Sequence, residues 1–327
     1  MKRNIAVIGC GHWGKNLVRN FSELGSLAAV SDPNSKLSSN YADLYKVNDF
    51  SFEEILNDKD IKGIVIATPV PLHATLGIKA MNAGKHVYIE KPLAMNIIEA
   101  KNLITASKDN NVQLMVGHLL QYHPVFIELL KLINLNELGN LHYLYSNRLS
   151  FGKIRSEEDV IWSFAPHDIS MILSVLKDDI KFVRCESSSF LQKNIADTAI
   201  IHMESESGLN AHIFVSWIHP YKEQKLVVVG EFATAIFDDT KPWDEKLALY
   251  NHETDTLSKP LSLNQSEIQY IKVTQSEPLK NECQHFIDVV DGKTKPHTDG
   301  VEGLKVLEIL TGATLSNNEN SKRIAVK

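Results

Sequence analysis

Hydrophobic residues in the first third of the chain form short unbroken runs that are separated by amphipathic stretches. The runs occupy residues 5–8, 27–30, 63–67, 86–89 and 113–116. One intervening helical pattern, at residues 71–83, begins with a proline and stops before Gly84, as a helix with a C-terminal glycine does. Apolar strands that alternate with helices predict a parallel sheet covered by helices on both faces.

The pattern changes after about residue 120. Helices are predicted at residues 122–135, 165–176, 278–290 and 301–315. Strands with partial alternation are predicted at residues 141–149, 181–190, 198–203, 209–218, 225–229 and 234–237. Consecutive strands joined by short turns favour a mostly antiparallel sheet. We therefore expect an α/β chain with two domains, at residues 1–120 and 121–327, whose last helices can pack back toward the first domain.

The second domain has too few predicted helices to cover both faces of its sheet. Apolar residues such as Ile201, Ile213, Val215 and Trp217 would give an uncovered face more apolar surface than a monomer exposes. Only one of the two alternating sets of side chains can point outward, and either set fits the pattern. A homodimer or homotetramer formed through this open sheet is expected.

The first apolar run leads directly into the sequence Gly9-Cys10-Gly11-His12-Trp13-Gly14, which a helical stretch follows. In such a strand–turn–helix unit the first glycine permits a tight turn, and the second lets the backbone approach a pyrophosphate. The third lets the helix pack close to the strand. The helix N-terminus adds free N–H groups and partial positive charge. The motif predicts a dinucleotide-binding Rossmann domain in which all three glycines, His12 and Trp13 line the cofactor site.

Asp32 closes the second apolar run, eighteen residues beyond Gly14. A carboxylate at this place accepts hydrogen bonds from the adenosine ribose hydroxyls and repels a 2′-phosphate. The next three residues contain no arginine, although Lys36 is close. We expect NAD to be preferred over NADP. The alternative for Asp32 is a helix-capping or turn aspartate before a proline.

Composition excludes several classes of function. The formal net charge is −6 and no basic block is present, which argues against nucleic-acid or anionic membrane partners. No apolar run approaches the roughly 20 residues that span a bilayer, and the first strand begins too early for a signal peptide. The three cysteines and the histidines show no metal-site or disulfide spacing, so no metal is expected. A cytoplasmic location is the default.

Two further segments are highly specific: residues 64–69, which read IVIATP, and residues 84–94, which read GKHVYIEKPLA. They resemble the Gfo/Idh/MocA family of NAD(P)-dependent sugar oxidoreductases. The resemblance runs through nearly the whole chain, at His73, Gly117-His118, Tyr122-His123-Pro124, Ala165-Pro166-His167-Asp168, Asn281-Glu282-Cys283 and Asp299-Gly300. It implies a Rossmann domain, a mixed-sheet domain that packs sheet to sheet in oligomers, and hydride transfer at a sugar carbon. Residues 117–240 look most like dehydrogenases of nucleotide sugars, which act on UDP-N-acetylhexosamines or related uronates for cell-surface polysaccharides.

Two residues are candidates for the chemistry. Lys91 follows a predicted parallel strand, at the sheet edge where ligands bind, and its ammonium can stabilise a developing alkoxide. The family resemblance also places Glu90 and Lys91 near the nicotinamide. His167, which we expect to open a helix after Pro166, is a suitable general base because its ordinary pKa is about 6.5.

The sequence departs from the family pattern at Ser163. Relatives commonly carry an aspartate there, one helical turn before the histidine, and a serine cannot raise the basicity of His167 as a carboxylate does. Asp168 is an alternative helper. Thr68, Pro69 and His73 are expected to border the nicotinamide ribose. For the substrate, the remaining candidates are Tyr122, Arg148 and Arg155, although a packed aromatic and ordinary ion pairs are the competing interpretations.

Three functional hypotheses follow. The leading one is an NAD-dependent enzyme that oxidises a secondary hydroxyl of a sugar or nucleotide sugar. The second is a glycosidase or epimerase that forms a transient ketone and recycles its NAD. The third is a catalytically silent regulator that senses dinucleotides, which Ser163 favours and the presence of both Lys91 and His167 opposes.

Overall fold

The computed structural model describes residues 3–152, 154–156, 158–255 and 262–326. The chain divides into two compact units, each described by itself below. Unit 1 comprises Met1–Tyr122 and Ser276–Leu307, and unit 2 comprises His123–Gln275 and Glu308–Lys327. The helix α9 (Gly300–Asn318) begins in unit 1 and ends in unit 2.

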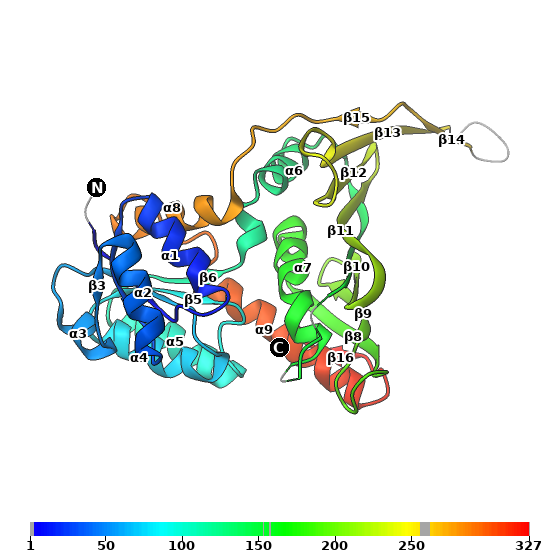
Figure 1. The fold of residues 1–327 in the computed structure, drawn as a ribbon. Coiled ribbons are helices and arrows are strands. Elements are labelled where there is room, and N and C mark those ends of the chain that lie inside the picture. The colour runs from blue at the N-terminus through cyan, green and yellow to red at the C-terminus, as the bar shows by residue number, and fades with distance from the viewer. Residues whose placement is uncertain (1–2, 153, 157, 256–261, 327) are drawn as a thin grey trace. The chain divides into compact units, whose positions relative to one another are not determined.

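Unit 1 contains a parallel sheet with helices on both sides (Figure 1). Its strands are β1 (Ile5–Ile8), β2 (Leu27–Ser31), β3 (Asn48–Asp49), β4 (Gly63–Ile66), β5 (His86–Glu90) and β6 (Leu114–Gly117). They pair in the order β3-β2-β1-β4-β5-β6. The helices are α1 (Gly14–Glu23), α2 (Ser35–Tyr45), α3 (Phe52–Asn57), α4 (His73–Asn82), α5 (Ile97–Asp109) and α8 (Pro278–Val290), with 3₁₀ turns η1 (Val70–Leu72) and η2 (Leu119–Tyr122). The strand order reverses between β1 and β4, and ligands bind at such a point, beyond the carboxyl ends of the strands.

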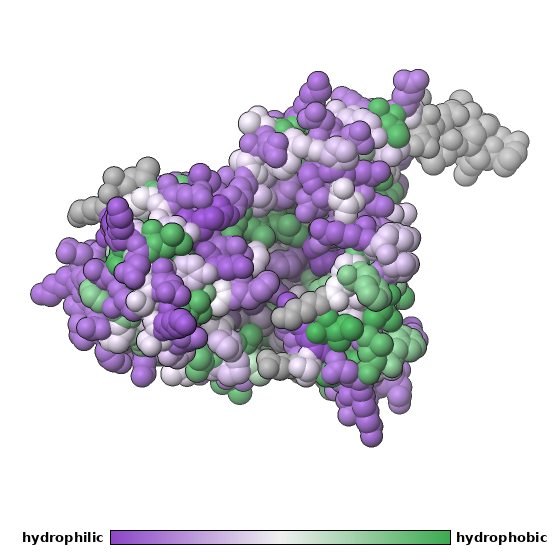
Figure 2. Space-filling view, viewed as in Figure 1, coloured by the Kyte–Doolittle hydropathy of each residue, from purple (hydrophilic) through white to green (hydrophobic). Residues whose placement is uncertain are grey.

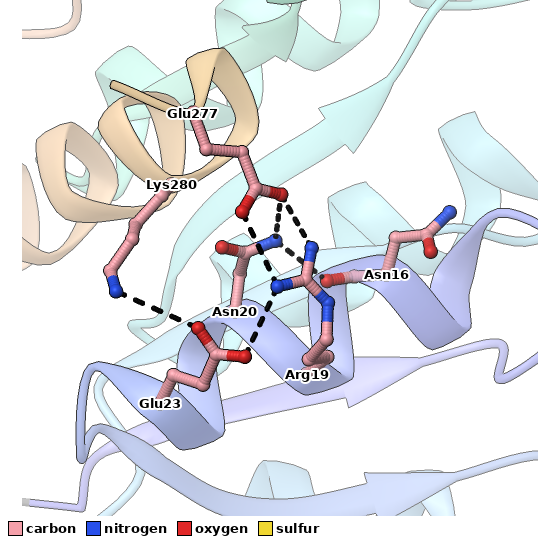
Figure 3. Close-up of polar contacts among 6 residues, drawn as sticks. All are labelled: Asn16, Arg19, Asn20, Glu23, Glu277 and Lys280. Carbon is pink, nitrogen blue, oxygen red and sulfur yellow. Dashed lines mark hydrogen bonds and ion pairs between the residues drawn. The ribbon is translucent and has the colours of Figure 1, made fainter. Parts of the chain in front are cut away.

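Helix α8 completes this unit although it lies far along the chain. The ring of Phe286 on α8 meets those of Phe21 at 6.3 Å and Tyr88 at 5.7 Å, both in edge contacts. Polar groups join the exposed sides of α8 and α1 (Figure 3). Glu277, at the N-terminus of α8, accepts hydrogen bonds from Arg19 at 2.5 Å and Asn20 at 3.2 Å. Helix α8 is therefore fixed against α1 by both apolar and ionic contacts.

Unit 2 is built on a large, mostly antiparallel sheet. Its strands are β7 (Leu141–Phe151), β8 (Ile180–Ser188), β9 (Thr198–Ser205), β10 (Asn210–Ser216), β11 (Ile218–Gly230), β12 (Ala233–Asp238), β13 (Leu247–Asp255), β14 (Ser262–Gln265), β15 (Gln269–Tyr270) and β16 (Ile324–Ala325). The order is β14-β13-β12-β11-β7-β10-β9-β8-β16, and β15 pairs with β13. Among the described strands of this sheet, β7 and β10 form the parallel pair. The expected α/β class and the mostly antiparallel second sheet are confirmed.

Helices cover one face of this second sheet (Figure 1). They are α6 (Pro124–Asn134), α7 (Val160–Leu176) and the end of α9, and the turn η3 (Trp243–Glu245) lies beyond β12. The apolar residues that we expected on the uncovered face are instead all buried, and this corrects the expectation. These residues are Ile201, Ile213, Val215 and Trp217. Helix α7 packs on this buried set, so the other alternating set points outward. The outward set consists of Ile200, His202, His212 and Phe214.

The outward face is less apolar than the sequence suggested. The cross-strand pair His202 and His212 has ring centroids 5.9 Å apart, and Tyr145 stacks on His212 at 5.3 Å. In the view of Figure 2, hydrophilic residues predominate over unit 1, and unit 2 shows both hydrophilic and apolar residues. No helix of the described part of the chain is long and apolar enough to cross a membrane.

Helix α7 begins five residues earlier than expected. Asp159 is its N-cap, and the carboxylate accepts a hydrogen bond from the backbone N–H of Trp162 at 3.0 Å. Pro166, which we interpreted as a helix start, lies inside the helix. His167 consequently sits in the second turn of α7 and not at its opening, because the capping aspartate outweighs the helix-starting tendency of proline.

Candidate functional site

The glycine-rich turn has the geometry that a bound dinucleotide requires. Gly9 has φ +93°, and a Cβ there would lie 2.6 Å from the carbonyl oxygen of Ala67. A Cβ at Gly14 would lie 1.9 Å from the carbonyl oxygen of Gly9. At Gly11, by contrast, no described atom lies within 4 Å of a built Cβ. The first and third glycines are thus needed by the fold, whereas the second leaves open space over the turn.

Asp32 lies at the end of β2, half buried, beside this turn. Its carboxylate accepts hydrogen bonds from the backbone N–H groups of Cys10 at 2.7 Å and Asn34 at 2.9 Å. Asp32 therefore holds the glycine turn and the start of α2 as well as presenting negative charge at the sheet edge. His12 and Trp13 are both exposed on the same turn.

Thr68, Pro69 and His73 follow β4. Thr68 is half buried and Pro69 is exposed, but His73 is almost fully buried. The His73 ring nitrogens lie 2.9 Å from the carbonyl oxygen of Thr68 and 3.0 Å from that of Pro92. Burial lowers the pKa of His73, which favours the neutral imidazole. His73 thus joins the loops after β4 and β5 from inside the protein.

Glu90 ends β5, and Lys91 is the next residue, half buried at the carboxyl edge of the sheet. The Glu90 carboxylate accepts hydrogen bonds from the indole N–H of Trp13 at 2.7 Å and from the Tyr88 hydroxyl at 2.9 Å. In unit 1, this edge therefore brings together the glycine turn, Asp32, the loop after β4 and Lys91. Parallel strands place their ligand crevice there.

His167 and Ser163 belong to unit 2, on helix α7. Ser163 is buried and lies one turn before His167, which is half buried. The spacing that the family pattern implies is therefore present in the helix, with serine at the place of the aspartate.

Asp168 and Arg148 bind each other. Asp168 is fully buried, and its carboxylate accepts hydrogen bonds from Arg148 Nε at 2.6 Å and Nη2 at 3.2 Å. The Ser146 hydroxyl donates a third at 2.5 Å. A bidentate arginine with an added hydroxyl satisfies a buried carboxylate well. The pair joins α7 to β7, and Asp168 is committed to that contact.

The two remaining substrate candidates have local partners. Tyr122 is buried in unit 1, and its hydroxyl lies 2.9 Å from that of Thr298, which donates to the carbonyl oxygen of Val116. Arg155 is exposed in unit 2 and pairs with Glu158. These contacts are those of a packed aromatic and an ordinary ion pair. Within the described ranges, no three histidine, cysteine or acidic side chains cluster as metal ligands would.

Sequence reasoning gave no functional role to two residues of this region, Tyr88 and Glu282, although both lie in segments that carry the family resemblance. Tyr88 is two residues before Glu90 on β5, so the two share a face of the sheet, and that spacing was an available signal. Glu282 lies on α8 and is fully buried. Burial and the negative charge of Glu90 raise the pKa of Glu282 well above its usual range. Nothing in the spacing of α8 shows that it packs beside β5.

Residues 3–118 match the family described as "Oxidoreductase family, NAD-binding Rossmann fold", and residues 126–236 match the "GFO/IDH/MocA C-terminal domain". UDP-N-acetylglucosamine 3-dehydrogenase of Acidithiobacillus ferrooxidans is 26% identical, over 92% of this chain and 93% of that protein. The scyllo-inositol 2-dehydrogenase (NAD(+)) of Bacillus subtilis is also 26% identical, over 95% of this chain and 93% of that protein.

Solved structures share the fold. The structure of UDP-N-acetylglucosamine 3-dehydrogenase from A. ferrooxidans aligns with a TM-score of 0.85 at 23% identity, over 98% of this chain and 99% of that chain. The WlbA dehydrogenase from Bordetella pertussis, solved in complex with NADH and UDP-GlcNAcA, aligns with a TM-score of 0.80 at 20% identity, over 100% of this chain and 99% of that chain. Both halves of the sequence and the fold agree: the chain belongs to the Gfo/Idh/MocA family of oxidoreductases.

Proposed function

We propose that this protein is an NAD-dependent dehydrogenase that oxidises a secondary hydroxyl of a nucleotide sugar, a UDP-N-acetylhexosamine or a related uronate, for cell-surface polysaccharide synthesis. The observation that carries the proposal is the edge of the unit 1 sheet. There an open glycine turn, the Asp32 carboxylate and Lys91 follow the ends of strands in one sheet. A dinucleotide and a reacting hydroxyl require this combination.

The glycine turn and the N-terminus of α1 would hold the pyrophosphate, and Asp32 the adenosine ribose. Thr68, Pro69, His73 and Glu90 belong to the segments that would border the nicotinamide half. When bound, NAD supplies the hydride acceptor. Lys91 would donate a hydrogen bond to the substrate hydroxyl and stabilise the oxygen as negative charge develops on it. His167 would accept the hydroxyl proton, with the neutral imidazole as the active form.

The substrate class draws support from relatives that match over most of their length. One is named for UDP-N-acetylglucosamine and another for scyllo-inositol. These two named compounds differ in a large anionic group, the nucleoside diphosphate, which only the first carries. Arg148 and Arg155 were the sequence candidates for such a group. Since Arg148 is committed to Asp168, the exposed Arg155 is the better candidate for contact with a diphosphate or carboxylate.

The proposal is tested by mixing the protein and NAD with a panel of UDP-sugars and free polyols while nicotinamide absorbance is followed. Net NADH formation with a UDP-sugar supports it, and formation only with polyols moves the substrate to the inositol class. Product formation without net NADH would indicate the NAD-recycling glycosidase or epimerase. Binding of NAD with no turnover of any compound would indicate the dinucleotide sensor.

The preference for NAD over NADP is expected to depend on the charge of Asp32. Asp32→Asn keeps a side-chain oxygen as an acceptor for one backbone N–H but removes the repulsion toward a 2′-phosphate. The ratio of the NADP to the NAD dissociation constant should fall by about tenfold. Fluorescence titration with both cofactors measures the ratio. Asp49→Asn, an exposed acidic residue of β3, is the matched control. Equal affinity of the unchanged protein for both cofactors would contradict the assignment.

We also propose that two copies pair through the outward face of the second sheet, as a homodimer or as half of a homotetramer. Large apolar residues exposed there or on the neighbouring loops include Tyr143 and Ile200. Ile200→Glu together with Phe214→Glu should convert the oligomer to a monomer in light scattering at micromolar concentration. Leu44→Glu, an exposed apolar residue of α2 in unit 1, should leave the mass unchanged. A monomeric unchanged protein would refute the pairing.

A cytoplasmic location fits the chemistry. All three cysteines are buried free thiols, as is usual in a reducing compartment.

A further inference from the structure

A buried set of side chains adjoins Lys91 in unit 1. We call it the Glu90 network, and it consists of Trp13, Tyr88, Glu90 and Glu282. One oxygen of Glu90, Oε1, accepts hydrogen bonds from the Trp13 indole at 2.7 Å and from the Tyr88 hydroxyl at 2.9 Å. The other, Oε2, accepts one from the backbone N–H of Lys91 at 3.3 Å. The carboxylate is thus held by three donors from two different segments of the chain.

The fold reserves space for this carboxylate. Glu90 pairs in register with Gly117 on β6. A Cβ at Gly117 would lie 2.6 Å from the Tyr88 hydroxyl and 2.9 Å from Glu90 Oε2. Any larger residue at 117 would therefore displace the network. Tyr88 and Glu90 lie on one face of β5, and the absence of a side chain on the neighbouring strand gives that face its room.

The network contains two buried carboxyl groups, those of Glu90 and Glu282. Burial raises the pKa of Glu90, but the hydrogen bonds from Trp13 and Tyr88 and the charge of Lys91 oppose that rise. Burial and the charge of Glu90 raise the pKa of Glu282 well above its usual range, and Tyr88 opposes that rise. Neither of its oxygens is held by a well-aligned hydrogen bond within the described residues, and burial beside Glu90 favours its protonated form. Glu90 thus has hydrogen-bond donors from Trp13, Tyr88 and the Lys91 backbone, which favour its carboxylate form.

Trp13 connects this network to the glycine turn, because it lies between Gly11 and Gly14. We propose that Trp13 is a positioning residue for Lys91: its indole N–H holds the Glu90 carboxylate, which in turn fixes the strand end from which the Lys91 side chain extends. The hydrogen bond between Trp13 and Glu90 then links the segment that would bind pyrophosphate to the residue that precedes Lys91. The proposal rests on the proposed catalytic role of Lys91.

Kinetics of three variants test it. Trp13→Phe keeps the ring and removes the donor, so kcat should fall by about tenfold through misplacement of Lys91, while the dissociation constant for NAD changes by less than about twofold. Glu90→Ala should lower kcat at least as much. In the double variant the effect of Trp13→Phe should vanish, because residues that act through one another are not additive. The proposal would be overturned if the losses of kcat in Trp13→Phe and Glu90→Ala were additive in the double variant. It would also be overturned if Trp13→Phe weakened NAD binding without lowering kcat.

Trp243→Phe is the matched control. The Trp243 indole donates to the carbonyl oxygen of Val273 at 2.6 Å in unit 2, so this change also removes an indole hydrogen bond, but one unconnected with Glu90. It should leave kcat unchanged. Trp13 is 39% exposed, and Trp13→Phe should fold normally, which the melting temperature verifies.

A second measurement does not depend on turnover. We expect a limiting amine-modifying reagent to label Lys91 about threefold faster or more in Trp13→Phe and Glu90→Ala, because the strand end that carries the amine is no longer fixed. Mass spectrometry of the peptide that contains Lys91 measures the labelling rate. Labelling of Lys79 on α4 serves as the internal reference. If no sugar is oxidised but labelling changes in this way, the proposed function fails and the positioning role stands. Unchanged labelling of Lys91 would refute it.

Discussion

Replacement of Lys91 with methionine is expected to lower kcat for sugar oxidation by about a hundredfold or more. Methionine retains an unbranched apolar stem and removes the ammonium that would stabilise the developing alkoxide. The dissociation constant for NAD should change little, because the glycine turn and Asp32 are untouched. Initial rates of NADH formation and a fluorescence titration with NAD measure the two quantities on the same preparation.

His167→Gln should lower kcat by a similar factor, since proton removal must accompany hydride departure. The two losses have different dependence on pH. Activity limited by His167 rises as the imidazole loses its proton, so the acid limb of the rate profile should be absent in His167→Gln and retained in Lys91→Met. Lys101→Met on α5 is the control for the lysine. Full activity in the double variant Lys91→Met, His167→Gln would show that the chemistry lies elsewhere.

Arg148→Met is expected to reduce the free energy of unfolding by about 3–5 kcal/mol. Asp168 is fully buried, and the change leaves its carboxylate with the Ser146 hydroxyl but without the bidentate arginine. The cost arises from a buried charge that has lost its partner, so it should exceed the value of the ion pair itself. Urea unfolding followed separately by circular dichroism and by tryptophan fluorescence measures it, and also tests whether unit 2 unfolds in its own transition.

The control is Arg323→Met, which removes the contact with Glu204 at 2.6 Å, where the side chains are 55% and 36% exposed. It also removes the guanidinium that lies 3.7 Å from the centroid of the Phe182 ring. That loss should stay below about 1 kcal/mol, because water and salt screen a surface pair. Replacing both buried partners, Arg148→Met with Asp168→Leu, should recover part of the stability. A loss at Arg148 no larger than the loss at Arg323 would contradict this account of the pair.

Much of unit 1 could be predicted from the sequence. A strand buried on both faces is mostly apolar, so β1 and β4 appear as continuous runs and β5 as a run that ends at Glu90. The glycine turn marks where the first of them ends. The two-residue strand β3 has no such run and was not predicted. The position of Asp32 and Lys91 at the sheet edge could be predicted because each directly follows a buried strand.

In unit 2, the sequence pattern does not show which face of the sheet is buried or which elements contact one another. Alternation defines two faces of a strand but not which of them a helix covers, so the inward position of Ile213 and Trp217 depends on where α7 packs. The partner of Asp168 was not predictable for the same reason. Arg148 and Asp168 lie on different elements, and their contact follows from how a helix is placed over a sheet. Short edge strands such as β15 and β16 have too few residues to show a period.

The division of unit 1 into two separate stretches of chain has a consequence for how the protein matures during synthesis. The aromatic core around Phe21 and Tyr88 is completed by Phe286 and Leu279, which the ribosome adds after all of the intervening unit 2 segment. Until then the emerging N-terminal segment presents an open apolar surface and has no helix α8 to cover it. Chaperone capture of ribosome-bound chains should therefore persist until about residue 290 has left the exit tunnel. A gene fragment that ends at residue 122 should yield insoluble protein.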